Sequence, residues 1–178
     1  MSALRSDAAR SRSRILEAAR HEDPDDLRFN HIAREAGVGV GTVYRHFPNA
    51  HALKEALTAE TLAEMVQVSQ KASSEPDAAT ALRAFVGTAL ALQLENGGLQ
   101  AVLLSPDDES ESVRAMKSEI FSTFTEVLER ASQSGAIRPD VTVEQLEHLI
   151  CGVEHATRLG SPEHRYLFLD VLMAGLRA

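Results

Sequence analysis

The stretch GVGVGTVYRHFPNAHAL, residues 37–53, joins a glycine-rich turn to a cluster of polar, basic and aromatic side chains. Arg45 can donate two parallel hydrogen bonds to the edge of a guanine, and the methyl groups of Val40 and Thr42 can contact a thymine methyl. These groups therefore suit the reading of base-pair edges in the major groove of DNA.

Other groups in the same stretch suit the phosphate backbone. The Tyr44 hydroxyl and the His46 imidazole can bind phosphate oxygens. Gly39 and Gly41 carry no side chains, so a backbone can approach them closely. Asn49 begins the next helix, whose free N–H groups can hold a further phosphate. We expect base readout and phosphate binding to lie side by side on this segment.

Two short helices are predicted to position these groups. The first is expected to be capped by Asp25 or Asp26 and to end at Gly37, because glycine favours the left-handed exit from a helix. The second runs from about residue 40 to residue 47, before Pro48. Two short helices joined by a tight glycine turn indicate a helix-turn-helix, which lays its second helix in the major groove.

The second of these helices has two distinct faces. At about 100° per residue, Val40, Val43 and Phe47 share an apolar face that we expect to pack inward. The opposite face carries small, polar and basic residues, among them Thr42 and Arg45. For Phe47 a packing role is favoured, whereas Tyr44 at the edge of the apolar face is predicted to contact DNA.

Charge is distributed unevenly along the chain. The formal net charge is −8 over 178 residues, which by itself argues against a nucleic-acid partner. Residues 1–55, however, hold nine Lys/Arg and eight Asp/Glu, whereas the remaining residues hold nine and eighteen. Arginines are concentrated at the start, and the segment from Arg5 to Arg12 is either a basic arm on DNA or a solvated tail. One end of the molecule can therefore meet a polyanion.

Helical spacing appears almost everywhere, and it predicts an all-α protein of about nine helices. The expected domains are a three-helix helix-turn-helix DNA-binding domain at residues 1–50 and a helical ligand-binding and dimerisation domain at 51–178. The expected helices cover approximately residues 7–20, 25–36, 40–47, 49–72, 78–95, 99–104, 110–133, 143–159 and 163–176.

Several classes of protein are disfavoured by composition. No apolar run approaches the ~20 residues of a membrane-spanning helix, and the first residues lack the apolar stretch of a signal peptide. Cys151 is the single cysteine, in keeping with a reducing compartment. We expect a cytoplasmic protein. No nucleophile elbow, phosphate loop or paired-cysteine spacing is present, so neither an enzyme nor a cofactor is predicted.

The segments ILEAA, HIAREAGVGVGTVYRHFPNAHALKEAL and RYLFLDVLMAGLRA resemble those of bacterial TetR-family transcriptional regulators. The likeness is specific over about residues 14–57 and architectural beyond them. It implies a homodimer that binds an operator and leaves it when a small molecule occupies the larger domain, with helices 143–159 and 163–176 forming the dimer. The positions matching the family's DNA contacts are Asn30, Val40, Gly41, Thr42, Tyr44, Arg45, His46 and position 50.

The chain departs from the family pattern at three places. Ala50 stands where the family usually has a phosphate-binding lysine, and Lys54 or His51 is a potential substitute. The stretch between Ala19 and Ile32 is about four residues shorter than usual and lacks the family's Gly-aromatic turn, so HEDPDD must make a tighter and more acidic corner. Arg28 occupies the usual position of a Ser/Thr cap.

The larger domain carries polar residues on apolar helix faces, and each polar group needs a partner there. Gln93 and Lys117 are such residues, and their partner is a ligand, the backbone or water. Effector contacts are predicted for Met65, Phe85, Leu92, Gln93, Leu103, Lys117, Phe121 and Phe124. Because most of these are apolar, a largely apolar effector is expected, although the same residues also suit a simple core.

One face of helix 143–159 carries Glu144, His148, Cys151 and His155. Such residues can bind a transition metal, but they also suit a dimer interface, and no metal site is predicted. The favoured function is a ligand-responsive repressor that binds a near-palindromic double-stranded DNA operator. The alternatives are a helical ligand-binding protein or enzyme with a vestigial helix-turn-helix, and a helical adaptor that binds proteins through its acidic surface.

Overall fold

The computed structural model describes residues 2–178, with side chains from residue 6 onward, and every regular element in this range is helical. The predicted all-α class is confirmed. In order along the chain, the helices are α1 (Ser2–Ala19), α2 (Phe29–Glu35), α3 (Val40–His46), α4 (Ala50–Ser74), α5 (Ala78–Glu95), α6 (Leu99–Leu104), α7 (Glu111–Gln133), α8 (Val143–Leu159) and α9 (His164–Gly175). None of them is long and apolar enough to cross a membrane.

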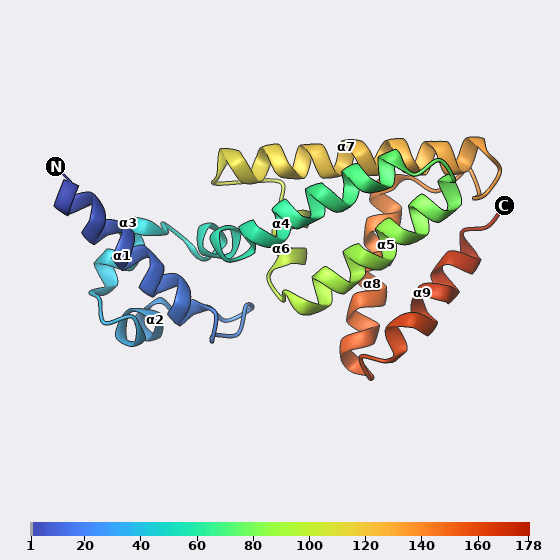
Figure 1. Cartoon of the computed structure of the whole chain (residues 1–178). Helices are drawn as coiled ribbons and strands as arrows, with labels where there is room; N and C mark the ends of the chain where they lie inside the picture. Colours follow the sequence, from blue (N-terminus) through green and yellow to red (C-terminus); the bar gives the residue numbers. More distant parts are fainter. Residues whose placement is uncertain (1) are drawn as a thin grey trace.

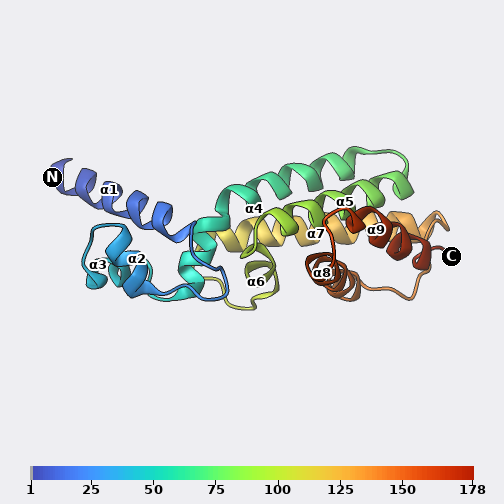
Figure 2. The same cartoon turned by 90° about the horizontal axis from the view of Figure 1, so that it is seen from below.

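The helices form an elongated molecule with two separate apolar cores (Figure 1). Helices α1–α3 enclose a small core that includes Ile15, Ile32 and Val43. The remaining helices share a larger core. Figure 2 shows the three N-terminal helices gathered at one end, with α5, α7, α8 and α9 at the other.

Helix α4 belongs to both parts. Leu53 near its start is buried in the small core, whereas Leu62 and Met65 are buried in the larger one. Its 25 residues give it a length of about 37 Å at the rise of an α-helix. It packs along α7 and α5. Helix α4 can therefore transmit a movement of the larger domain to the small one.

Several helix boundaries follow from local capping. The side chain of Asn49 accepts a hydrogen bond from the Ala52 backbone N–H at 2.8 Å, and Asp77 accepts one from Thr80 at 2.7 Å. Gly37 takes a φ of 62° at the exit of α2, as predicted for a left-handed helix end.

The start of α2 differs from the prediction. The helix begins at Phe29, after an Arg28 that makes no side-chain cap hydrogen bond. Asp25 and Asp26 do not cap it, because they belong to a turn in which the Asp23 carboxylate accepts from the Asp25 N–H at 2.9 Å. A carboxylate just before a predicted helix can accept a hydrogen bond from the backbone N–H of a turn instead of capping the helix, since both offer free N–H groups.

This short acidic corner reaches the larger domain. A Cβ at Gly97, in the turn between α5 and α6, would lie 3.0 Å from Pro24 Cγ. Lys54 Nζ lies 3.7 Å from the Asp25 carboxylate. The corner and the turn line a cleft of about 230 Å³. The shortened corner thus packs between the small core and the helices of the larger domain.

Candidate nucleic-acid interface

Helix α3 is anchored by one apolar face. Val43 is fully buried and Phe47 is nearly so, both within the small core. Val40 is 40 % exposed, so the prediction that it packs with them is wrong. As the first residue of α3, it lies one turn before Val43, where the small core ends. Its methyl groups are therefore on the open surface, as a thymine contact would require.

Of the groups predicted to contact DNA, Arg45 lies opposite the buried face of α3 and Tyr44 lies at the edge of that face. Tyr44 is 55 % exposed, while its ring packs against Phe29 with the centroids 4.9 Å apart. Arg45 is exposed, and Thr42 and His46 are half-buried. The tyrosine ring is thereby fixed by packing, while its hydroxyl-bearing edge remains open to a ligand.

The glycines of this segment leave the surface flat. A Cβ added at Gly41 would meet no described atom within 4 Å, and one at Gly39 would meet only Thr42 Oγ1, at 4.0 Å. Neither glycine is therefore needed for packing inside the protomer. Side chains at these positions would stand out from α3, where they would keep a duplex away.

The polar residues on either side of α3 differ in how free they are to bind DNA. Asn30 is exposed on α2. Asn49 is also exposed, but its amide N–H donates to the Glu109 carboxylate at 2.7 Å while its oxygen caps α4. The Asn49 side chain is thus occupied by contacts within the protomer, and the N–H groups of the first turn of α4 remain as the phosphate-binding feature.

Neither predicted substitute for the lysine missing at Ala50 is free in this conformation. The Lys54 side chain is largely covered and pairs with Asp25. The Nε2 atom of His51 lies 3.2 Å from the Glu55 carboxylate. Both side chains are engaged within the protomer, and position 50 itself offers no cation.

The N-terminal arginines belong to α1, which begins at Ser2 and not at residue 7 as expected. Arg10 pairs with Asp7, and the Arg12 guanidinium lies 5.3 Å from the centre of the Phe47 ring. The side chain of Arg5 lies outside the described residues. The described part of this basic segment is therefore an exposed stretch of helix, from which Arg12 reaches over Phe47.

In the larger domain, the predicted effector contacts fall into two groups. Met65, Phe85, Leu92, Leu103 and Phe124 are buried in the larger core, and Phe121 packs against its edge. Lys117 is buried elsewhere, at the loop between α6 and α7, where its ammonium donates to the Ser105 carbonyl and to Asp108, each at 2.7 Å. Lys117 thus has partners within the protein.

Gln93 is 1 % exposed and lies beside a buried carboxylate. Its Nε2 is 3.4 Å from Glu147 Oε1, and its own Oε1 is a buried atom without a hydrogen-bond partner in the described part of the chain. Burial raises the pKa of Glu147 above its usual range. A polar pair with one unmet acceptor therefore lies within the larger core.

Sequence reasoning missed three buried carboxylates, Glu55, Glu147 and Glu154. A signal for Glu55 existed: Glu55, Thr58 and Leu62 share the three- and four-residue spacing of the buried stripe of α4. Glu147 lies on α8 next to the face that carries Glu144, His148, Cys151 and His155, one turn before Cys151. There Glu144, His148 and His155 are exposed and spread along the helix, whereas Cys151 is half-buried with Sγ 3.9 Å from Glu147 Oε1.

Comparison with known proteins gives this geometry a family. Residues 15–61 match the model of bacterial regulatory proteins of the tetR family. Residues 75–178, more than half of the chain, match the model of the SbtR-like transcriptional regulator C-terminal domain. The chain belongs to the TetR family of transcriptional regulators.

Relatives in the TetR family resemble the chain to different extents. An HTH-type transcriptional regulator of Staphylococcus aureus strain USA300 is 44 % identical over 48 residues, and this match spans 25 % of the chain and about a quarter (26 %) of that protein. The crystal structure of a TetR transcriptional regulator from Streptomyces coelicolor is 30 % identical, with a TM-score of 0.56, covering 93 % of this chain and 98 % of that one.

Two further TetR-family structures share the fold. AmtR of Mycobacterium smegmatis has a TM-score of 0.62 at 22 % identity, over 90 % of this chain and 83 % of that one. FadR of Bacillus subtilis, in complex with stearoyl-CoA, has a TM-score of 0.58 at 19 % identity, over 93 % and 99 %. The arrangement of a small helix-turn-helix part on a larger helical part is thus that of the TetR fold.

Proposed function

We propose that this TetR-family protein is a homodimeric repressor that binds a near-palindromic operator and is released from it by a small molecule. The observation that carries the proposal is the exposed face of α3. Its apolar side is held by Val43 and Phe47, while Tyr44 and Arg45 face solvent. A surface so built offers one bidentate donor for a base edge and one hydroxyl for a phosphate.

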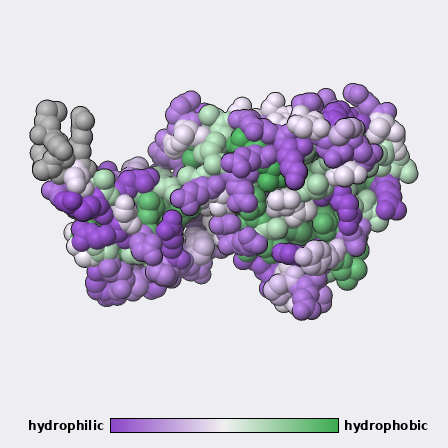
Figure 3. All heavy atoms as spheres, in the orientation of Figure 1, coloured by the Kyte–Doolittle hydropathy of each residue, from purple (hydrophilic) through white to green (hydrophobic). Residues whose placement is uncertain are grey.

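A dimer is supported by apolar residues that α8 and α9 leave uncovered. None of residues 164–175 is buried in the protomer. Leu159 is 77 % exposed and Val171 is 63 % exposed, and Leu149 and Leu167 are exposed too. In the space-filling view, apolar surface gathers over the larger domain, while the α1–α3 part is mostly hydrophilic (Figure 3). Exposed apolar surface of this kind marks an interface.

The spacing of these residues fits helix-on-helix packing. On α8, Gln145, Leu149, Gly152, Ala156 and Leu159 recur at alternating intervals of four and three residues, and all are exposed. On α9, Leu167, Val171 and Ala174 follow the same rule. Such a repeat forms a continuous stripe along a helix. Two copies of this surface related by a twofold axis would make a four-helix interface.

A twofold dimer fixes the form of the operator. Each protomer presents one α3, so the two half-sites are expected to be inverted repeats on one face of the duplex, separated by whole helical turns. An effector that changes the separation of the two α3 helices then weakens binding. A release factor of 100 corresponds to about 2.7 kcal/mol of differential effector binding between the two conformations.

For the effector site, Gln93 is the strongest of the predicted contacts. Its buried Oε1 has no hydrogen-bond partner among the described residues, and a ligand that donates to it would remove the desolvation cost of that atom. The neighbouring core, which includes Phe85 and Leu92, is apolar. We propose a largely apolar effector with one hydrogen-bond donor, admitted by rearrangement of these side chains.

Selection of bound fragments from random DNA tests the DNA-binding part of the proposal. The wild-type protein is expected to enrich an inverted repeat. Arg45→Ala should relax the preference at one position of each half-site by about 1–3 kcal/mol. Lys71→Ala is the matched control, because it removes one exposed cation near the far end of α4. If wild-type protein enriches no inverted repeat, or Arg45→Ala returns the unchanged motif, the assigned reading role is wrong.

A further inference from the structure

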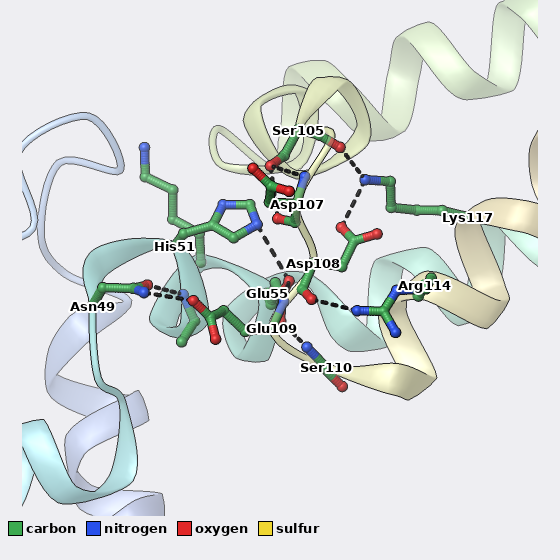
Figure 4. Close-up of polar contacts among 12 residues, drawn as sticks. Asn49, His51, Glu55, Ser105, Asp107, Asp108, Glu109, Ser110, Arg114 and Lys117 are labelled. Atoms are coloured by element: carbon green, nitrogen blue, oxygen red, sulfur yellow. Dashed lines mark hydrogen bonds and ion pairs between the residues drawn. The ribbon is translucent and has the colours of Figure 1, made fainter.

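Three side chains capable of binding a metal converge where α4 meets the loop between α6 and α7. They are His51 and Glu55, one helical turn apart on α4, and Asp108 in the loop (Figure 4). One ligand atom from each lies within 4.8 Å of the other two. In the described part of the chain, no other set of three such residues comes this close.

One nitrogen of the His51 imidazole has no hydrogen-bond partner in this cluster. Its Nε2 is a buried atom that lies 3.2 Å from Glu55 Oε1, but not in the orientation of a hydrogen bond, and it has no hydrogen-bond partner among residues 2–178. If Nε2 is unprotonated, its lone pair lies close to a negative oxygen and has no donor to accept from. A cation between the two atoms would turn this unfavourable approach into two coordinate bonds.

The two carboxylates are held in place from behind. Glu55 is nearly fully buried, and its two oxygens accept hydrogen bonds from the backbone N–H groups of Glu109 at 2.8 Å and Ser110 at 2.9 Å. Asp108 is 7 % exposed and accepts from Lys117. Metal ligands are commonly oriented by such outer hydrogen bonds, and the backbone N–H groups on Glu55 supply part of that support already.

Lys117 occupies the position of a competing cation. With a neutral imidazole, the side chains of His51, Glu55, Asp108 and Lys117 carry two negative charges and one positive charge. A divalent cation would reverse the sign of this net negative charge. The Lys117 ammonium is tied to the Ser105 carbonyl as well as to Asp108. A metal must therefore bind against the repulsion of this ammonium, or displace it from Asp108.

We propose that His51, Glu55 and Asp108 form a site for a first-row divalent transition metal such as Zn²⁺. One imidazole nitrogen and two carboxylate oxygens suit such ions, and three protein ligands leave a position for water. Ca²⁺ and Mg²⁺ are disfavoured, because they require oxygen ligands in larger number. The bound ion would join the first turns of α4 to the loop that begins α7, independently of whether the protein binds DNA.

Calorimetric titration of untagged, chelator-treated full-length protein with Zn²⁺ tests the proposal, and Co²⁺ absorption reports the ligand geometry. One ion per protomer is expected. His51→Gln and Asp108→Asn should each weaken binding by about 10- to 100-fold, which is at least the loss seen when a supporting residue is removed. His155→Gln is the control, since His155 is exposed on α8. Zinc binding equal in wild type and His51→Gln would overturn the site, as would no binding by wild type.

Substitution of Lys117 gives a second test, in which zinc binding is expected to become tighter instead of weaker. Lys117→Met removes the competing charge at similar volume, and should tighten Zn²⁺ binding by about tenfold. Circular dichroism establishes that the variant folds. Tighter binding supports the geometry, because a merely structural lysine predicts no gain, and unchanged or weaker binding by the folded variant would overturn it. If Lys117→Met does not fold, the titration of His51→Gln alone decides.

Discussion

Glu55, in the second turn of α4, accepts a hydrogen bond from the backbone N–H of Ser110 at 2.9 Å. Ser110 is the N-cap residue of α7, whose own side chain makes no cap hydrogen bond. A buried carboxylate from one helix thus satisfies the free N–H groups at the start of another, where negative charge is favoured. The helix that follows α3 is in this way joined to the larger domain.

Loss of this junction should destabilise the protein. Glu55→Gln leaves one oxygen for two backbone N–H groups and places an amide N–H₂ against one of them. We expect a loss of about 1–3 kcal/mol in the free energy of unfolding, measured by denaturant titration. Glu60→Gln, at an exposed position of the same helix, is the control. Equal stability of the two variants would show that the contact contributes nothing.

Removal of one hydroxyl tests the phosphate role of Tyr44. In Tyr44→Phe the ring stacking on Phe29 is retained, so the melting temperature should not change. Operator affinity should fall by about 1 kcal/mol, or roughly fivefold, through loss of one hydrogen bond. Fluorescence anisotropy with the selected operator measures the effect. An affinity equal to that of wild type, with a normal melting curve, would exclude the contact.

A lysine at position 50 should restore the phosphate contact that the chain lacks. Ala50 is exposed at the first position of α4, Lys54 pairs with Asp25, and His51 lies against Glu55. Ala50→Lys is expected to steepen the dependence of log K on log salt by about one ion. Ala63→Lys adds the same charge farther along α4 and should leave the slope as in wild type. Equal slopes for both variants would place no phosphate near residue 50.

Gly152 offers a test of the dimer. A Cβ there would meet no described atom within 4 Å, so the protomer tolerates a side chain. Gly152→Arg would place a long cation in the centre of the α8 stripe, and we expect the dimer to dissociate into folded monomers in analytical ultracentrifugation. Ser122→Arg on the exposed side of α7 is the control. An unchanged dimer in the Gly152 variant would move the interface away from α8.

The buried Glu147 predicts a pH-dependent stability. Its pKa is raised in the folded protein, chiefly by burial, from an ordinary value of 4.5, so the native state binds a proton more tightly than the unfolded state does. This carboxyl therefore lowers stability as the pH rises from 4.5 through the raised pKa. Its cost is complete above that pKa and absent well below 4.5.

Glu147→Gln should remove this cost. An amide at this position also can donate to the unpartnered Gln93 Oε1, a hydrogen bond of about 1 kcal/mol. Each kcal/mol corresponds to about 2–4 °C in Tm for a chain of this size. Thermal unfolding at several pH values is expected to show a gain that is largest at neutral pH and shrinks toward pH 4. Glu144→Gln, exposed on the same helix, should show no such gain, and a pH-independent effect at Glu147 would contradict the assignment.

The sequence by itself determined the features that depend on neighbours within about four residues. Gly37 ended α2 in the left-handed conformation, Asn49 capped α4, and Val43 and Phe47 formed the buried face of α3. These outcomes rest on backbone sterics, short-range hydrogen bonds and the 3.6-residue period, all of which are readable from the order of residues. The tyrosine-arginine surface of α3 and its family likeness follow from the same local information.

Only the tertiary structure decided which distant residues meet. Glu55 and Ser110 are 55 positions apart, and Gln93 and Glu147 are 54 apart. The choice of Asp25 for a turn, the exposure of Val40 and the convergence of His51 with Asp108 depend on how α4, α6 and α7 pack. Each helix alone is compatible with many arrangements of its neighbours, and packing selects one of them. Whether a residue is buried depends on the shape of the surface that packs against it, and not only on the helix that carries it.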